Sequence, residues 1–344
     1  MSNNTKDSND NDQHGGNEEI TSSKKECTSC EQNNVDNITE DFDSVAILDD
    51  ISTCASCGKE GNSNDMNTCN KCQLVKYCNA ACKKKHRKKH KKACERRVAE
   101  LHDEQLFKEH PLPEECPICM LPLPHETNTS HFMLCCGKSI CIGCSFEMET
   151  GDLCSFCRMP EAEADEENIQ RVKKLMDKGN ADAFNMLGNW YDDGEMGLPQ
   201  DYRKANELFL KAGELGCAFA YNNLGVHYNL GQGVEVDKQR GKYYLELAAM
   251  MGSVDARFKL GNKEARAGNE RAKKHYILGS KAGHKTSLEA VKKAYEYGLV
   301  TKDEYASTLR AYHERQKEMK SDARDKAAAG WAALDKLAAN QNQI

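Results

Sequence analysis

The chain has 344 residues, of which 39% are hydrophobic and 30% are charged, and its formal net charge is −6. This length predicts two or three domains, and the acidic balance argues against a nucleic-acid-binding surface spread over the whole chain. The first residues contain no apolar signal segment, and no run of 18 apolar residues occurs, so we expect an intracellular protein of cytoplasm or nucleus without a membrane span. In that reducing setting the 18 cysteines are expected to bind metal rather than each other.

Residues 1–50 are rich in Asn, Asp, Ser and Glu. Such a composition buries too little apolar surface to offset chain entropy, so this acidic, polar tail is expected to be disordered. Cys27 and Cys30 form a CxxC pair within it, with no second pair nearby. Two interpretations stay open: a pair of free thiols, or half of a metal site that a partner completes.

Residues 54–94 contain four pairs of potential metal ligands. The first two pairs have two residues between their members, as in a chelating tight turn, and the members of the last two pairs are four positions apart, as on one face of a helix. Sulfur with one imidazole favours zinc over magnesium or calcium, and eight ligands fill two tetrahedral sites. A disulfide framework or unligated thiols is the alternative. The eight candidates are Cys54, Cys57, Cys69, Cys72, Cys78, Cys82, His90 and Cys94.

This ligand pattern, with Tyr77 before the third pair, resembles the MYND zinc finger. The resemblance implies cross-bracing, with Cys54, Cys57, Cys78 and Cys82 on one zinc ion and Cys69, Cys72, His90 and Cys94 on the other. It also implies a groove for proline-containing peptides. The family usually has His-Trp where this chain has His86 and Arg87, so we expect weak, salt-sensitive binding of acidic peptides, aided by Lys83, Lys84 and Lys88.

Residues 83–92 read KKKHRKKHKK, and eight of these ten residues are Lys or Arg. The simplest interpretation is a solvated helix face whose charge offsets that of the thiolate sites. A nuclear-import signal or a nucleic-acid-binding patch without base specificity is the alternative. Residues 95–113 are expected to form a helical linker, with a polar helix that ends before Pro111 and Pro113.

A second set of four cysteine pairs lies within residues 114–160. Its second pair consists of two adjacent residues, Cys135 and Cys136, and His131 is an alternative to Cys135. Lys138 is excluded as a ligand because its amine is protonated at neutral pH. The eight candidates are Cys116, Cys119, Cys135, Cys136, Cys141, Cys144, Cys154 and Cys157.

The order of these pairs, the CPIC opening and the terminal Cys157-Arg158 resemble an all-cysteine RING finger. The resemblance implies that the first and third pairs share one zinc ion and the second and fourth pairs share another. It further implies a ubiquitin ligase without a covalent catalytic residue, in which Ile118 contacts the conjugating enzyme and Arg158 positions ubiquitin. Met148 and Ser155 replace the usual Trp and Pro. A structural or docking module without ligase activity is the alternative.

After an acidic linker at residues 160–168, the sequence repeats with a period of 36 or 37 residues. The period relates Ala183, Ala220 and Ala256, and likewise Gly188, Gly225 and Gly261. Such a period indicates a helical solenoid, and its A-x3-LG-x2-Y pattern resembles Sel-1-like repeats, relatives of tetratricopeptide repeats. We assign residues 170–320 to this domain, with residues 287–319 as a capping helix pair.

Three further features of this region have specific expectations. Thr301 and Glu304 fit a helix capping box. Cys217 is expected to be a small buried residue rather than a ligand. The Ala-rich tail, 321–344, is expected to be helical up to Leu337, with Trp331 available to dock on the solenoid or on a partner.

The expected architecture is a multidomain chain with two cross-braced zinc fingers of irregular α+β structure, followed by an all-α solenoid. We expect four zinc ions, two in each finger. The function favoured is a zinc-dependent protein-interaction protein, with a RING-type ubiquitin ligase or ligase adaptor as the candidate activity. The alternative is a non-enzymatic scaffold, with a nuclear or transcriptional role as one option. Expected partners are peptides at the first finger, a ubiquitin-conjugating enzyme at the second and a protein on the repeats, with nucleic acid a weaker candidate.

Overall fold

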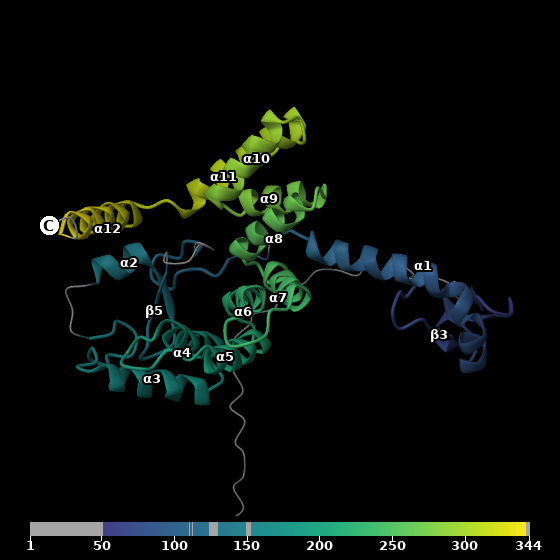
Figure 1. Cartoon of the computed structure of the whole chain (residues 1–344), viewed down its shortest axis with the longest axis horizontal. Coiled ribbons are helices and arrows are strands. Elements are labelled where there is room, and N and C mark those ends of the chain that lie inside the picture. Colours follow the sequence, from purple (N-terminus) through teal and green to yellow (C-terminus); the bar gives the residue numbers. More distant parts are fainter. Residues whose placement is uncertain (1–50, 110, 112, 124–129, 149–152, 342–344) are drawn as a thin grey trace, which may run out of the picture. The chain divides into compact units, whose positions relative to one another are not determined.

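The structure is a computed structural model that describes residues 51–341 except 110, 112, 124–129 and 149–152. The expectations for residues 1–50, including Cys27 and Cys30, therefore lie outside the described residues. The described part contains three two-stranded antiparallel sheets and twelve α-helices. A cysteine-rich region precedes an all-helical solenoid, which confirms the expected fold class (Figure 1). No helix of the described residues has the length and apolar character needed to cross a membrane.

The first finger is built from two short hairpins and one long helix. Strands β1 (Ile51–Thr53) and β2 (Glu60–Asn62) pair antiparallel, and a 3-10 turn (Ser63–Asp65) leads to the pair β3 (Asn67–Thr68) and β4 (Lys76–Tyr77). Helix α1 (Ala80–Leu106) follows directly.

Helix α1 begins where Asn79 caps it. The Asn79 side-chain oxygen accepts a hydrogen bond from the backbone N–H of Cys82 at 2.9 Å, which satisfies one of the free donors at a helix N-terminus. The polar helix expected in the linker before Pro111 is present, but it is continuous with the helix that carries the last zinc ligands of the first finger. A single helix of 27 residues runs through, because neither Gly nor Pro interrupts the sequence between residues 80 and 106.

The second finger contains one hairpin and one short helix. Strand β5 (Ser130–Phe132) pairs antiparallel with β6 (Ser139–Cys141), and α2 (Ile142–Glu147) follows with Cys141 as its N-cap. Its small core is formed mainly by Leu123, Ile140 and buried cysteines. The finger thus has little apolar interior besides its potential metal ligands.

The solenoid alternates two kinds of helix. In the first two repeats, the first helix ends at a glycine with a left-handed backbone, Gly194 or Gly231, and the second is capped by an aspartate, Asp201 or Asp237. The helices are α3 (Asp165–Asp177), α4 (Ala181–Asp193), α5 (Tyr202–Glu214), α6 (Ala218–Leu230), α7 (Lys238–Met250), α8 (Val254–Arg266), α9 (Arg271–Lys281), α10 (Lys285–Glu296) and α11 (Lys302–Met319).

The repeating glycines mark the closest approach of the two helices in each repeat. A Cβ added to Gly188 would lie 2.6 Å from the Phe209 ring, and one added to Gly261 would lie 2.5 Å from the Tyr276 ring. At Gly225 the same position would be 2.8 Å from Leu245. Only glycine fits at these points, which explains why it recurs with the period of the repeat.

Two expectations for the end of the solenoid are met. Helices α10 and α11 occupy the region expected to form the capping pair. The capping box is confirmed, since the Thr301 hydroxyl accepts from the Glu304 backbone N–H and the Glu304 carboxylate accepts from the Thr301 N–H.

Cys217 is buried and belongs to none of the potential metal groups.

The end of α1 is anchored on helices α7 and α8 of the solenoid. Leu106 is fully buried in a cluster with Leu245 and Leu260. The buried Arg257 guanidinium donates to the carbonyl oxygens of Leu106, at 2.7 Å, and Lys108, at 3.2 Å. Since the carboxyl end of a helix carries partial negative charge, these carbonyls partly compensate a cation whose pKa burial lowers to about 10.

Phe107 extends this anchor. Its ring lies 4.8 Å from that of His275, between centroids, and the side chains of Arg271 and Lys274 lie over it at 5.3 and 5.2 Å. Burial lowers the pKa of His275 to about 3, with the nearby Arg257 and Arg271 charges adding to the effect. The imidazole is therefore neutral at physiological pH and acts as a flat wall against Phe107.

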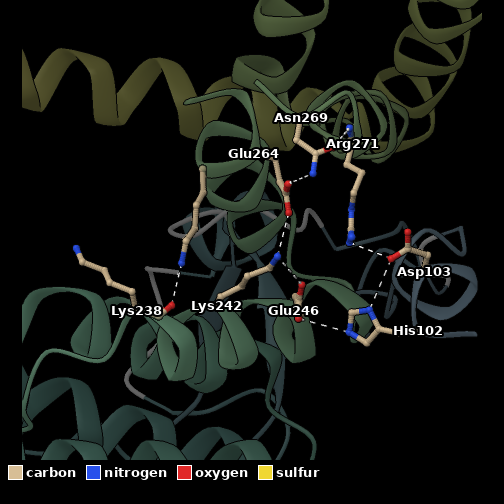
Figure 2. A network of polar contacts seen from close by, with 9 residues as sticks. His102, Asp103, Lys238, Lys242, Glu246, Glu264, Asn269 and Arg271 are labelled. Carbon is tan, nitrogen blue, oxygen red and sulfur yellow. Dashed lines mark hydrogen bonds and ion pairs between the residues drawn. The ribbon is translucent and has the colours of Figure 1, made fainter. Parts of the chain in front are cut away.

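A polar network surrounds the same joint (Figure 2). Asp103 of α1 pairs with Arg271 at 3.0 Å, and His102 lies 3.4 Å from the Glu246 carboxylate. Lys242 bridges Glu246 and Glu264, at 3.6 and 3.1 Å. Because Glu246 and Glu264 are buried, loss of the Lys242 ammonium would leave two carboxylates without their cation.

This anchor predicts a large stability difference between two positions of α1. Leu106→Ala removes a fully buried side chain and should lower the free energy of unfolding by about 3 kcal/mol. Val98→Ala, at a partly exposed position of the same helix, should change it by less than about 0.5 kcal/mol. Urea denaturation followed by circular dichroism measures the free energy of unfolding of both variants. A change for Leu106→Ala as small as that for Val98→Ala would contradict the anchor.

Candidate metal centres

The structure brings the sixteen ligands proposed from the sequence into four groups of four. In each group the ligand atoms all lie within 4.8 Å of one another. The groups are Cys54, Cys57, Cys78 and Cys82 (site 1); Cys69, Cys72, His90 and Cys94 (site 2); Cys116, Cys119, Cys141 and Cys144 (site 3); and Cys135, Cys136, Cys154 and Cys157 (site 4). Both fingers are thus cross-braced, with the first pair grouped with the third and the second with the fourth.

The distances within the groups fit tetrahedral zinc. Four sulfurs at a Zn–S distance of about 2.3 Å would be about 3.8 Å apart. The observed Sγ–Sγ distances include 3.7 Å for Cys57–Cys78, 3.8 Å for Cys69–Cys94 and 3.7 Å for Cys119–Cys141. A disulfide would require about 2 Å, and the described cysteines are all free. The disulfide alternative is therefore excluded for both fingers.

Each site of the first finger combines a hairpin with a helix. The first knuckle, Cys54–Cys57, lies between β1 and β2, and the second, Cys69–Cys72, lies between β3 and β4. Site 1 is completed at the start of α1, by Cys78 before the N-cap and Cys82 after it. Site 2 is completed two to three turns further along the same helix, where the His90 Nε2 lies 3.2 Å from the Cys72 Sγ.

His86 supports this arrangement without joining either group. Its Nδ1 lies 3.3 Å from the hydroxyl of the buried Tyr77, and its ring stacks on that of His90. The residue therefore lies beside a ligand, which is the usual place for side chains that orient a metal-bound imidazole.

Four knuckles share one backbone turn. In each, the N–H of the residue four positions after the first cysteine donates to that cysteine's carbonyl oxygen, over 2.8 to 2.9 Å. That residue has a left-handed backbone: Gly58, Gln73, Met120 and Arg158 have φ of 74°, 55°, 57° and 59°. Three of these are not glycine, so the turn imposes a conformation that such side chains adopt rarely.

Backbone N–H donors favour ionisation of the first cysteine of each knuckle. A hydrogen bond from the Cys78 backbone N–H is the main reason that the pKa of Cys54 falls to about 6. Burial opposes ionisation of Cys69, but N–H donors of its own knuckle lower its pKa to about 6. Burial also opposes ionisation of Cys116, but the Cys141 N–H, together with donors of the Cys116 knuckle, lowers its pKa to about 6. The same balance lowers the pKa of Cys154 to about 7. Each site thus has one thiol ready to bind metal as thiolate.

The adjacent cysteines of the second finger are accommodated by the loop between β5 and β6. There the backbone N–H groups of Cys136 and Gly137 both donate to the Met133 carbonyl oxygen, and Gly137 has a φ of 71°. This turn directs both Cys135 and Cys136 into site 4. His131 lies exposed on β5 opposite Ile140 and joins none of the four groups, so the alternative that placed it in Cys135's position was wrong.

Site 3 has an outer contact that the sequence did not suggest. Arg324 lies near the start of α12 (Asp322–Gln341) and is buried. Its guanidinium donates to the carbonyl oxygens of Pro122, at 2.9 Å, and Leu121, at 3.4 Å, and lies 3.8 Å from the Cys119 Sγ. An arginine beside a thiolate offsets its charge and fixes its orientation.

Helix α12 packs closely on α2. A Cβ added to Gly143 would lie 2.6 Å from the Arg324 backbone nitrogen, so only glycine permits this approach. Gly330 faces Phe146 in the same way, and Ala327 is fully buried. The Ala-rich tail is therefore a helix seated on the second finger, while Trp331 remains partly exposed.

Comparison with known families identifies two parts of the chain. Residues 54–94 match the model of the MYND finger, and residues 181–217 and 218–253 each match the Sel1 repeat. The chain contains a MYND finger and Sel1 repeats. A MYND finger is a zinc-binding module, and the donor sets of all four groups fit zinc. The two matches do not cover the second finger, and no curated protein matches the sequence.

Similar solved structures include several repeat proteins. A Sel1 repeat protein from Oxalobacter formigenes is 22% identical, with 51% of this chain and 80% of that chain covered and a TM-score of 0.39. Cysteine-rich protein B of Helicobacter pylori is 26% identical over 26% of this chain and 68% of its own, with a TM-score of 0.26. The protective antigen c5321 of uropathogenic Escherichia coli is 23% identical, covered over 44% of its length, with a TM-score of 0.29. At these scores the likeness carries no functional argument.

Four sites predict four zinc ions for each chain. Chelation should unfold residues 54–157, because each site can contribute on the order of 10–16 kcal/mol to folding. Residues 170–320 should keep their helical circular dichroism, since they contain no residue of the four groups. Elemental analysis gives the ion count, and two zinc ions or fewer would contradict one of the fingers.

The outer contact of site 3 makes a separate prediction. Arg324→Ala should weaken zinc binding at this site roughly tenfold, the usual effect of removing an outer-sphere partner. Competition with a chromophoric chelator measures this zinc affinity. The affinity of the Arg324→Lys variant is expected to lie between those of the Arg324→Ala variant and the parent protein. Arg310→Ala, at an exposed arginine of α11, is the control. Equal zinc release from the Arg324→Ala and Arg310→Ala variants would show that Arg324 does not support the site.

Proposed function

We propose that this protein assembles other proteins through its MYND finger and Sel1 repeats, and that its second finger is a RING-type ubiquitin ligase module. MYND fingers and Sel1 repeats are protein-interaction modules. The ligase part rests on the second finger, whose order of ligand pairs resembles that of a RING.

The observation that carries the ligase proposal is the cross-brace of the second finger. Sites 3 and 4 alternate along the sequence, so the two knuckles Cys116–Cys119 and Cys154–Cys157 belong to different sites. Helix α2 starts directly after Cys141 and contains Cys144, the two ligands of the third pair. A pair of knuckles fixed on two metal centres provides a rigid surface, which is what holding another enzyme in a reactive pose requires.

Both knuckles carry exposed apolar side chains. Ile118 and Met120 belong to the first knuckle and are 41% and 66% exposed, while Leu153 and Met159 flank the second and are 50% and 42% exposed. Apolar groups of this size left in solvent are typical of protein-docking surfaces. They support the role of Ile118 as a contact for a conjugating enzyme.

Arg158 is placed to act on a docked partner. It is exposed, directly follows the last ligand and is held by the left-handed turn of its knuckle, with its N–H donating to the Cys154 carbonyl oxygen at 2.9 Å. Its planar guanidinium offers several donors at fixed angles. In the proposed reaction it would hydrogen-bond the conjugating enzyme and its thioester-linked ubiquitin, and the protein would supply no nucleophile.

A non-enzymatic scaffold is the second candidate, and one observation favours it. Met148, at the usual Trp position, is partly buried against the core of the finger and offers little exposed wall to a partner. Ser155 gives a polar, exposed group where a proline is common. In a scaffold, the knuckle side chains would bind a protein without promoting ubiquitin transfer.

Autoubiquitination with a panel of conjugating enzymes tests the ligase proposal. Ile118→Ala should weaken enzyme docking, and Ile51→Ala, at an exposed isoleucine of the first finger, should not. Arg158→Ala retains a Cβ at the strained position and should slow transfer at least tenfold, while docking and zinc content stay unchanged. Docking without transfer by the parent protein would favour the scaffold, and transfer unaffected by Arg158→Ala would contradict the RING-type mechanism.

A further inference from the structure

The first half of α1 carries a dense positive surface. Residues 51–94 contain eleven Lys and Arg against two Asp and Glu, a formal charge of +9 in a chain of −6. The rest of the chain therefore carries −15. Seven thiolates and two Zn²⁺ ions would add −3 to the finger and still leave it at about +6. The finger thus keeps a large positive charge even after the net negative charge of its metal sites is counted.

The helix separates this charge from the metal ligands. Cys82, His86, His90 and Cys94 recur every four residues and face the finger's interior. The basic side chains occupy the remaining faces and are all exposed; they are Lys84, Lys85, Arg87, Lys88, Lys89, Lys91 and Lys92. Nine residues of helix span about 12 Å, so seven cations lie within two and a half turns.

Few groups of the described chain neutralise these cations. Lys91 makes one ion pair, 3.9 Å long, with Glu95, and both side chains are highly exposed, so the pair is weak. Lys83 differs, because its ammonium donates to the Asn70 side chain at 3.1 Å and belongs to the finger's own structure. Beyond Lys92 the charges are mixed: two arginines, Arg96 and Arg97, are accompanied by four acidic residues up to Glu104, and Arg97 forms ion pairs with two of them. The basic surface is therefore concentrated in residues 84–92.

The basic surface lacks an anchor of the kind protein partners use. None of the exposed residues between 84 and 92 is apolar or aromatic, whereas the strong contacts of protein interfaces come from aromatic and other large side chains in desolvated pockets. A nucleic-acid backbone needs only a closely spaced set of cations, and it is bound by release of counterions. The surface therefore fits a polyphosphate better than a folded protein or a peptide.

We propose that residues 84–92 bind the phosphate backbone of a nucleic-acid duplex without sequence specificity. An α-helix with its side chains is about as wide as the major groove of B-DNA, roughly 12 Å, so the outer face of α1 can lie along the groove with lysines on both phosphate walls. The segment contains neither Asn nor Gln, the side chains that read adenine. With about five phosphate contacts, binding should weaken a few hundred-fold between 50 and 200 mM salt.

Fluorescence anisotropy of the full-length, zinc-loaded protein with a labelled 20-base-pair DNA duplex tests this proposal. Replacing Lys84, Lys88 and Lys91 by Gln together should weaken binding more than tenfold at 100 mM salt. The slope of the logarithm of the binding constant against the logarithm of the salt concentration should also decrease, as expected for the loss of roughly three phosphate contacts. The corresponding Lys→Arg triple variant should bind as the parent does. Replacing the exposed Lys285, Lys293 and Lys317 of the solenoid by Gln should change binding less than twofold.

Competition distinguishes the possible ligands. An RNA duplex of the same length should bind more weakly, because its deep, narrow major groove does not admit a helix, and equal binding would overturn the groove geometry. An acidic peptide of equal charge that displaces the duplex and binds more tightly would overturn the proposal in favour of a protein partner. Equal binding by the parent and the Gln triple variant, with zinc content confirmed in both, would overturn it as well, as would lack of binding by the parent at 50 mM salt.

Discussion

Tetrahedral coordination by cysteine and histidine is the constraint on which residues 54–157 depend. The buried cluster of the first finger consists of Cys54, Cys69, Cys72 and Cys94 together with Tyr77, so the ligands are themselves most of the core. A segment of about 40 residues cannot bury enough apolar surface to fold alone. Cross-bracing compensates for this, since each metal centre joins segments that are far apart in the sequence and orders the loop between them.

Helix α1 carries this constraint beyond the finger. It supplies Cys82, His90 and Cys94 to the two metal groups, and the same helix ends at Leu106, which is buried among residues of α7 and α8. Arg257 and the wall formed by His275 then fix the carboxyl end and Phe107. Metal binding at one end of the helix and side-chain packing at the other are therefore parts of one continuous element.

The sequence predicted what depends on local spacing. Cysteine pairs two or four residues apart can chelate only in a few ways, so the ligand groups and the irregular fingers followed from the pattern, and the repeat period indicated the solenoid. It did not predict contacts between distant segments. Arg324 approaches Cys119 across about 200 residues, and Arg257 meets Leu106 across about 150, and no local signal marks either residue.

The left-handed backbone at Gln73, Met120 and Arg158 was missed for a different reason. Glycine is the usual sign of such a conformation, and only the knuckle that contains Gly58 shows it. The continuity of α1 was missed because Pro111 and Pro113 mark the end of a helix but give no information about where it begins. These features required the three-dimensional structure, whereas the repeating glycines of the solenoid could be located from the sequence.

Substitution of zinc by cadmium, followed by ¹¹³Cd NMR of the full-length protein, tests the central claim most directly. Cadmium binds the same thiolate-rich sites, and its signal reports the ligand set of each ion. The structure predicts four resonances, three from all-sulfur sites and one from a site of three sulfurs and the His90 nitrogen, with only the last changed by His90→Cys. Fewer than four resonances, or four all-sulfur signals in the parent protein, would contradict the assignment of four tetrahedral sites with His90 as a ligand.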